Sequence, residues 1–472
     1  MRADLVIRGG KIVTAISIFE AGIAVEGGKI VAIGNPEDLP IADEVLKADG
    51  KIILPGVIDP HVHFRDPGFE YKEDFHSGSV AAAYGGVTTV MDMPNTLPVV
   101  SNVQTFLEKK SEAQRKSVVD FCLIAAASPS NMPDLRHLAN AGAIYFKTVM
   151  GGYKASERPE TASMLSLNDG DLLSVFKAVA ATGRAVAVHA EGEDLREYFT
   201  NRIRGKAQLD YSAHFKSRPN LVEVEAVSRA ILVAAQAGCR LHIAHMSTLG
   251  AMSLVQQARA NGANISSETC PHYLFLNNHE AVPLGPNGVM NPSIKTEKDR
   301  VALWQGVKTG TIDFISTDHA PHTSEDKRAG DGNVLKTPAG VIGVETFLPL
   351  MMTEALRGRI TLQQVVSLTS KNAAKLFGIY PRKGAIAIGS DADLVIVDPK
   401  RSATVTQESL HSKSKNSPFI GMRVTGIPVH TIVRGKRIMS DGELIAKPGS
   451  GKFVNPDQPP NDLQLTSPQR HS

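Results

Sequence analysis

The chain has 472 residues, enough for about two to four domains of ordinary size, although a single barrel can absorb about 250 residues. Hydrophobic residues make up 42% of it, so a large core can form, and a disordered protein or a small disulfide-stapled scaffold is excluded. The 51 Lys and Arg residues nearly balance the 48 Asp and Glu residues, for a formal charge of +3. This balance argues against binding of nucleic acid or of a membrane surface through charge.

Cysteine usage and the lack of long apolar runs predict a cytoplasmic protein. Cys122, Cys239 and Cys270 are an odd, widely spaced set, which argues against a disulfide framework and favours a reducing compartment. Their spacing also differs from that of a zinc finger. The sequence begins with a strand-like stretch at residues 3–8, and no apolar run reaches the about 18 residues that a membrane span needs.

Residues 1–52 predict short strands separated by turns, with no evident helix. Gly9-Gly10 and Gly27-Gly28 are hairpin signals between apolar stretches. The strands are expected at residues 4–7, 11–13, 22–25 and 29–33.

From residue 53 to 382 the pattern changes to apolar runs that alternate with helix-like stretches. Buried strands followed by helices are typical of parallel βα units, and seven or eight such strands predict a barrel. The strand-like runs are residues 87–91, 118–124, 143–149, 185–188, 241–244, 263–266 and 312–316. Helices are expected at residues 172–181, 222–237 and 251–260.

The strand-and-turn pattern returns after residue 383. The stretches 393–397 and 430–435 are similar to residues 4–7 and the glycines that follow them, so we expect both chain ends to build one small β-domain. From about Gly449 onward no periodic pattern remains, which predicts a mobile tail or an oligomer arm. The predicted division is 1–52 and 383–450 for the β-domain, 53–382 for the barrel, and 451–472 for the tail.

The strongest local signal is Asp59-Pro60-His61-Val62-His63, directly after the apolar segment 52–58. Because side chains alternate between the faces of a strand, His61 and His63 point the same way. Two imidazoles at the C-terminal end of a barrel strand can chelate a metal ion, and barrel active sites lie at that end. The alternative is a polar strand face without function.

Three further strands also end on a possible ligand. His189 follows the run 185–188, His245 follows 241–244, and Asp318 follows 314–317. Any one of them alone would more often be a buried polar residue with ordinary partners. Together with His61 and His63, however, four strand ends converge on histidine or aspartate, which favours a metal centre.

Lys147 ends the otherwise apolar stretch 143–146. A buried ammonium is costly unless it is paired or its pKa falls, so a lysine paired with a nearby carboxylate is the ordinary interpretation. A neutral amine can instead add carbon dioxide and become a carbamate, which is an anionic oxygen ligand able to bridge two metal ions.

These six positions resemble the binuclear metal centre of the amidohydrolase superfamily, in particular its cyclic amidases: dihydroorotases, hydantoinases (dihydropyrimidinases) and allantoinases. The resemblance covers residues 1 to about 453. It implies a distorted (β/α)₈ barrel with a β-sandwich built from both chain ends. It also implies two divalent metal ions, expected to be zinc, carbon dioxide held as a carbamate on Lys147, a small-molecule cyclic amide substrate, and a homodimer or homotetramer.

The resemblance also assigns roles within the centre. One metal ion would take His61, His63, Lys147 and Asp318, and the other would take Lys147, His189 and His245. Asp318 would act as the catalytic residue that takes a proton from the attacking hydroxide and passes it to the leaving nitrogen.

Four residues resemble the substrate-binding positions of dihydroorotases. Arg65, Asn95 and His322 are similar to the residues that hold the substrate carboxylate, and Asn291 to one that contacts the substrate ring. A guanidinium and an amide suit a planar anion. Each residue alone could be a surface ion pair or a turn asparagine. The stretch 412–419 also resembles the C-terminal part of dihydroorotases.

Other features resemble hydantoinases and allantoinases instead. They are Lys147 itself, the stretches 268–274 and 376–381, and Tyr153, a candidate for stabilising the oxyanion. We therefore expect a dihydroorotase-like hydrolase that interconverts dihydroorotate and N-carbamoyl-aspartate, with a hydantoinase, dihydropyrimidinase or allantoinase as the alternative. A non-catalytic hydantoinase-like scaffold is a remote alternative, because such proteins lack several metal ligands and every ligand position is filled here.

Overall fold

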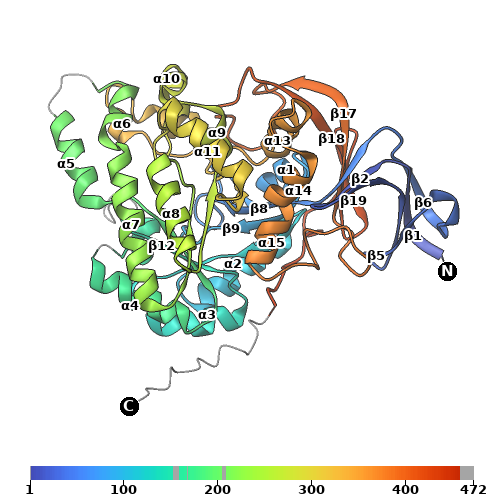
Figure 1. The fold of residues 1–472 in the computed structure, drawn as a ribbon, viewed down its shortest axis with the longest axis horizontal. Coiled ribbons are helices and arrows are strands. Elements are labelled where there is room, and N and C mark those ends of the chain that lie inside the picture. Colours follow the sequence, from blue (N-terminus) through green and yellow to red (C-terminus); the bar gives the residue numbers. More distant parts are fainter. Residues whose placement is uncertain (1, 153–158, 167, 205–208, 458–472) are drawn as a thin grey trace, which may run out of the picture.

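The computed structural model describes residues 2–152, 159–166, 168–204 and 209–457 (Figure 1). Strands from the two ends of the chain, drawn in blue and in orange to red, lie together on one side of the molecule. The green and yellow helices pack around the remaining strands on the other side. No helix in the described ranges is both long enough and apolar enough to cross a membrane.

The two chain ends share a sheet. Its seven strands run in the order β20-β19-β18-β17-β7-β2-β3, and β7 pairs antiparallel with β17 and parallel with β2. A four-stranded sheet, β5-β4-β1-β6, packs beside it. The bounds are β1 Arg2–Arg8, β2 Lys11–Val13, β3 Ile18–Glu20, β4 Gly22–Glu26, β5 Lys29–Gly34, β6 Ile41–Lys47, β7 Ile52–Pro55, β17 Leu394–Thr404, β18 Arg423–Val433, β19 Lys436–Ser440 and β20 Glu443–Leu444.

One apolar cluster explains why the distant segments associate. It joins side chains from both sheets, among them Leu5, Ile23, Ile53, Leu394 and Ile432. All four strands predicted within residues 1–52 are present, as β1, β2, β4 and β5. The sequence does not predict β3 and β6, because neither carries a buried side chain and so neither shows an apolar pattern.

The central strands are parallel and form a three-stranded sheet, β10-β9-β8, and a six-stranded sheet, β11-β12-β13-β14-β15-β16. Their bounds are β8 Val57–Val62, β9 Val87–Asp92, β10 Asp120–Leu123, β11 Ala125–Ala126, β12 Phe146–Val149, β13 Ala185–His189, β14 Arg240–Ile243, β15 Ile265–Thr269 and β16 Phe314–Ile315. Every predicted apolar run overlaps one of these strands. Residues 120–126 pass directly from one sheet to the other, and Val62 bridges in parallel to His319 beyond β16.

Helices connect and cover these strands. The three predicted helices are confirmed as α4, α7 and α8. The described helices are α1 Phe75–Tyr84, α2 Val103–Lys116, α3 Leu135–Ala141, α4 Asp169–Ala180, α5 Glu193–Ile203, α6 Tyr211–Ser217, α7 Asn220–Ala237, α8 Leu249–Ala260, α9 Pro271–Phe275, α10 Asn278–Ala281, α11 Glu297–Thr309, α12 Ser324–Arg328, α13 Phe347–Leu356, α14 Leu362–Val366 and α15 Asn372–Leu376.

The apolar segment 52–58 serves both parts of the fold. Residues 52–55 form β7 in the shared sheet, whereas residues 57–62 form β8 beside β9. Gly56 lies between them, and its N–H donates to the carbonyl of Asp393 at 2.8 Å. A Cβ atom at Gly56 would lie 2.1 Å from Oγ1 of Thr88, so only glycine fits where the chain changes sheets.

The first residues of the predicted mobile tail instead pair with a strand of the fold. The N–H of Phe121 donates to the carbonyl of Lys452 at 3.0 Å, and the N–H of Val454 donates to the carbonyl of Phe121 at 2.8 Å. The chain therefore runs alongside β10, and Asp457 still bonds to Gly378. Because the paired stretch is so short, no alternating pattern could reveal it. Residues 458–472 lie outside the described ranges.

A buried ion cluster joins β10 to the segment before β17. Nζ of Lys383 lies 2.5 Å from carboxylate oxygens of both Asp120 and Asp393, and 3.0 Å from that of Asp391. Arg434 also pairs with Asp120. Three carboxylates that could otherwise suit a metal ion thus surround an ammonium group.

Replacing Lys383 with methionine should lower the free energy of unfolding by about 3–5 kcal/mol, because it leaves buried carboxylates without their cation. Urea unfolding measures this loss. Lys400→Met, at an exposed position, is the control and should change stability by less than about 0.5 kcal/mol. Equal stability of the two variants would show that the cluster does not stabilise the fold.

Candidate metal centre

Five of the six predicted ligand residues lie at or just beyond the C-terminal ends of parallel strands, and Lys147 lies within one. All six line a single cavity, which Arg65, Asn95 and Asn291 also line. His61 lies on β8, Lys147 on β12 and His189 at the end of β13, whereas His63, His245 and Asp318 directly follow β8, β14 and β16.

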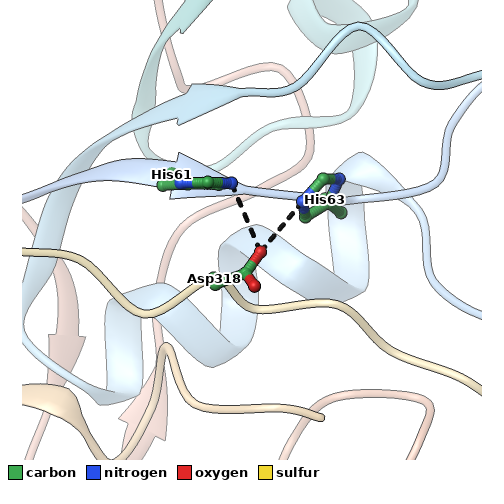
Figure 2. A group of neighbouring side chains, drawn as sticks. All are labelled: His61, His63 and Asp318. Atoms are coloured by element: carbon green, nitrogen blue, oxygen red, sulfur yellow. Dashed lines mark hydrogen bonds and ion pairs between the residues drawn. The ribbon is translucent and has the colours of Figure 1, made fainter. Parts of the chain in front are cut away.

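His61, His63 and Asp318 form the tightest group, with ligand atoms within 4.8 Å of one another. Figure 2 shows both imidazoles directed from β8 toward the Asp318 carboxylate. Oδ1 of Asp318 lies 3.3 Å from Nε2 of His61 and 3.0 Å from Nε2 of His63. The other ring nitrogens face oxygen atoms: Nδ1 of His61 lies 2.5 Å from Oε1 of Glu268, and Nδ1 of His63 lies 2.6 Å from Oδ1 of Asn95.

This hydrogen-bond pattern favours a cation in the group. Each ring donates from Nδ1, so its Nε2 lone pair faces the Asp318 carboxylate. Burial lowers the pKa of His63 to about 4, which keeps that ring neutral at physiological pH. Burial raises the pKa of Asp318, but in the metal-free protein a proton shared with Nε2 of His61 or His63 holds this pKa below its usual range, and a metal ion in that place would act in the same direction. Two lone pairs and a carboxylate oxygen therefore converge, an arrangement that suits a divalent metal ion.

Asp59 fixes the strand end that carries Asp318. It is fully buried, and it accepts hydrogen bonds from the N–H of Thr317 at 3.0 Å and from Oγ1 of Thr317 at 2.5 Å. Burial raises the pKa of Asp59 to about 7, against the effect of these hydrogen bonds. Asp59 therefore connects β8 to Thr317, the residue before Asp318. This connection fixes the position of Asp318 relative to the two histidines.

His189 and His245 form a second pair of facing nitrogens. Nδ1 of His189 lies 3.1 Å from Nε2 of His245, and Nε2 of His189 lies 2.9 Å from Oε2 of Glu191. Burial lowers the pKa of both histidines, so both rings are held neutral. Among the described residues, Nδ1 of His245 has no hydrogen-bond partner.

Lys147 lies beside both pairs and carries an unsatisfied amine. Only 3% of the residue is exposed, and its Nζ has no hydrogen-bond partner among the described residues. Burial lowers the pKa of Lys147 to about 8, although Glu268 and Asp318 act in the opposite direction. The expected ordinary carboxylate partner is absent within hydrogen-bond distance in the described ranges. A buried amine that is easily deprotonated suits carbamate formation.

The turns after the strands are strained. Arg65, His245 and Asp318 have φ values of 63°, 39° and 48°, in the left-handed region that residues other than glycine seldom adopt. Such strain is typical of functional sites, because the surrounding structure must hold the residue in place. Here the left-handed turn follows β8, β14 and β16.

The predicted substrate-binding residues divide into three that line the cavity and one behind it. Arg65, Asn95 and Asn291 line it, and Oδ1 of Asn291 is buried without a hydrogen-bond partner in the described part of the chain. His322 does not line it, but its Nε2 lies 3.2 Å from Nη2 of Arg65 and its Nδ1 lies 3.2 Å from Nζ of Lys72.

Two further segments border this side of the site. The 3₁₀ helix Pro159–Met164 contributes Glu160, Thr161 and Met164 to the cavity wall. The stretch 412–419 reaches the back of the site, where Ser414 and Asn416 donate to the carbonyl of His322 at 2.6 and 2.9 Å. Tyr153, the candidate for stabilising the oxyanion, lies outside the described residues.

A model of the Amidohydrolase family matches residues 52–438 of the sequence. This chain belongs to the amidohydrolase family. Members are metal-dependent hydrolases, and relatives of this amidohydrolase act on cyclic amides, so it is an enzyme that hydrolyses cyclic amide bonds.

Three relatives illustrate the range of cyclic amidases to which the chain is similar. It is 37% identical to an L-hydantoinase of Paenarthrobacter aurescens, covering 96% of this chain and 98% of the relative. It is 35% identical to a dihydroorotase of Methanosarcina acetivorans, covering 96% and 95%. It is 34% identical to an allantoinase of Rubrobacter xylanophilus, covering 96% and 98%.

Solved structures agree with this assignment. The L-hydantoinase (dihydropyrimidinase) from Arthrobacter aurescens superposes with a TM-score of 0.92 at 36% identity, covering 96% of this chain and all of that chain (100%). A D-hydantoinase superposes with a TM-score of 0.90 at 31% identity, covering 97% and 99%. The amidohydrolase is therefore similar in fold to these enzymes, which are of the TIM-barrel type, and it combines parallel strands and helices with a β-rich part.

Three residues that support the candidate ligands of this amidohydrolase, directly or through a neighbour, were not predicted from the sequence. Glu268 reaches His61, and Glu191 connects His189 to Arg218. Glu191 could have been found from the sequence, because it lies two residues after His189. Arg218 and Glu268 offer no such local signal, since each is separated from its partner by at least 27 residues of chain.

Proposed function

We propose that this amidohydrolase opens a cyclic amide that carries a carboxylate, with dihydroorotate, interconverted with N-carbamoyl-aspartate, as the first candidate substrate. One observation carries the proposal: Arg65, whose Nη2 lies 3.2 Å from Nε2 of His322, lines the same cavity as the six ligand residues. Asn95 and Asn291 add amide groups to that wall. A guanidinium flanked by amides suits a planar carboxylate on the substrate ring.

The ligand roles belong to the same proposal. One divalent ion, expected to be zinc, would be held by His61, His63 and Asp318, a second by His189 and His245, and both by Lys147 as a carbamate. The convergence of lone pairs on the two groups and the unsatisfied amine of Lys147 support this fit. When bound, such ions lower the pKa of water and polarise an amide carbonyl.

The protein's own residues supply binding and proton transfer. Asp318 is held ionised, so it can accept a proton from the attacking water and then deliver it to the leaving nitrogen. Oδ1 of Asn95 already accepts from His63, which directs its amide nitrogen to the substrate carboxylate. Arg65 orients the ring by pairing with the same carboxylate.

Arg65→Met tests the substrate assignment. We expect kcat/KM for dihydroorotate to fall about 10- to 100-fold, because hydrogen bonds to a charged group are lost, whereas turnover of dihydrouracil changes less than about threefold. Steady-state kinetics on the metal-loaded enzyme with dihydroorotate, dihydrouracil, hydantoin and allantoin measure both. Unchanged dihydroorotate turnover in the variant would contradict the carboxylate pocket.

Hydrolysis of hydantoin, dihydropyrimidines or allantoin is the second candidate function. Its support is the 37% identity to an L-hydantoinase and the lysine at position 147. In the same panel, wild-type turnover of hydantoin, dihydrouracil or allantoin without turnover of dihydroorotate would favour it.

We further propose that the parallel strands close into a (β/α)₈ barrel spanning about residues 53–382, inserted between the β-domain halves 1–52 and 383–450. The change of sheet at Gly56 moves the first boundary by a few residues. A cytoplasmic homodimer or homotetramer is the expected assembly. Sedimentation of the purified protein measures its oligomeric state.

A further inference from the structure

Glu191 connects a proposed metal ligand to a buried arginine. It is fully buried, and its Oε2 lies 2.9 Å from Nε2 of His189. Nη1 of Arg218 donates to the same oxygen. A buried carboxylate needs such a counter-charge, and Arg218, which supplies it, is not among the described residues that line the cavity.

Arg218 is itself fixed at both ends. Its Nη2 donates to the carbonyl of Gly152 at 3.2 Å. Its own carbonyl accepts from Nζ of Lys295 at 2.7 Å and from Oγ of Ser293 at 3.1 Å. The guanidinium can therefore hold Glu191 in one position rather than follow it.

The contact sets the tautomer and the direction of the His189 ring. Because a carboxylate only accepts, Nε2 of His189 carries the proton, and the Nδ1 lone pair faces Nε2 of His245, 3.1 Å away. The contact between Glu191 and His189 also requires glycine at position 152, where φ is 90°. A Cβ atom there would lie 2.9 Å from Oε2 of Glu191 and 3.1 Å from Nε2 of His189.

The other ligand group has a separate support. Oε1 of Glu268 contacts Nδ1 of His61, and it also lies 3.4 Å from the backbone nitrogen of His245, so Glu268 touches residues of both groups. Within the described part of the chain, His189 is the one residue among the six proposed ligands that Glu191 contacts. A change at Glu191 should therefore act on one metal position.

We propose that Glu191, anchored by Arg218, is a positioning residue that orients His189 and so sets the affinity of the metal position formed by His189 and His245, without acting on the position formed by His61, His63 and Asp318. The inference rests on the proposed metal centre. Removing a carboxylate that orients a ligand histidine costs about 10- to 100-fold in metal affinity.

The test is a Co²⁺ titration of the chelator-treated full-length protein in bicarbonate buffer, followed by calorimetry without substrate. In Glu191→Asp and Glu191→Gln one binding event should weaken about 10- to 100-fold, while the other changes less than about threefold. The aspartate keeps the negative charge opposite Arg218 but is too short to reach His189. Glu191→Asp therefore still tests the role of the contact with His189 if Glu191→Gln does not fold. Raising the Co²⁺ concentration should restore activity.

Glu193→Asp is the matched control. Glu193 lies near the same turn, pairs with Arg196 and accepts from the N–H of Gly152 at 2.7 Å, but no contact joins it to His189. This variant should bind Co²⁺ as the wild type does. To assign the weakened event, Glu191→Asp is combined with His189→Asn, where it should add no further loss, and with His61→Asn, where it should weaken the remaining event.

Unchanged Co²⁺ binding in both Glu191 variants would overturn the inference, as would equal weakening of both events or an equal loss in Glu193→Asp. A wild-type protein that binds two Co²⁺ ions but leaves dihydroorotate intact would overturn the substrate proposal alone. A wild-type protein that binds no Co²⁺ would overturn the metal centre and this inference together.

Discussion

Asp318→Asn should lower kcat by about 10²- to 10⁴-fold on every cyclic amide that the enzyme turns over, because an amide cannot carry the proton from water to the leaving nitrogen. The pKa of Asp318 lies below its usual range, so its carboxylate is ionised and carries no proton of its own at neutral pH. The substitution preserves size and hydrogen-bonding shape. KM should therefore change much less than kcat, and steady-state kinetics separates the two.

Asp313→Asn is the control for this prediction. Asp313 precedes β16, pairs with Arg259 and lies outside the cavity lining, so its loss should leave kcat within about threefold of the wild type. Retention of more than a tenth of the wild-type kcat in Asp318→Asn, with metal content unchanged, would rule out the proposed proton transfer.

Lys147→Met should abolish activity and tight metal binding while leaving the free energy of unfolding unchanged or higher. The amine is buried without a hydrogen-bond partner among the described residues, so an apolar side chain of similar length suits the metal-free site at least as well. Metal analysis after dialysis and urea unfolding in chelator measure the two effects. Wild-type activity in this variant would exclude a carbamate on Lys147.

The same residue predicts a pH dependence of the metal-free protein. The folded-state pKa of Lys147 is about 8, below the ordinary value of 10.5 that applies to the unfolded chain. Between these values the unfolded chain binds more protons, so the lysine's destabilising effect should fade as the pH rises from about 8 to 10.5. Wild type should therefore gain stability relative to Lys147→Met across this window in bicarbonate-free urea unfolding, and a constant difference would contradict the assigned pKa.

Much of the candidate site could be predicted from the sequence because the ligands lie at strand ends. In parallel strands these ends meet at one edge, so residues such as His189 and His245 are brought together by the pairing of β13 with β14. Because side chains alternate between the two faces of a strand, the sequence also predicts that His61 and His63 share one face. A family resemblance then assigned roles that spacing alone left open.

The sequence by itself therefore determined the alternation of strands and helices, the shared β-rich part of the two chain ends, and six residues that the structure places around one cavity. Only the tertiary structure decided that His322 lies behind Arg65, that residues 452–454 pair with β10, and that the chain changes sheets at Gly56. The supporting carboxylate Glu268 belongs to this second group, since it is 207 residues from His61. The local periodicity of a sequence indicates which side chains of one helix or strand are buried and which face they share. Contacts between distant segments depend instead on how the helices and strands pack together.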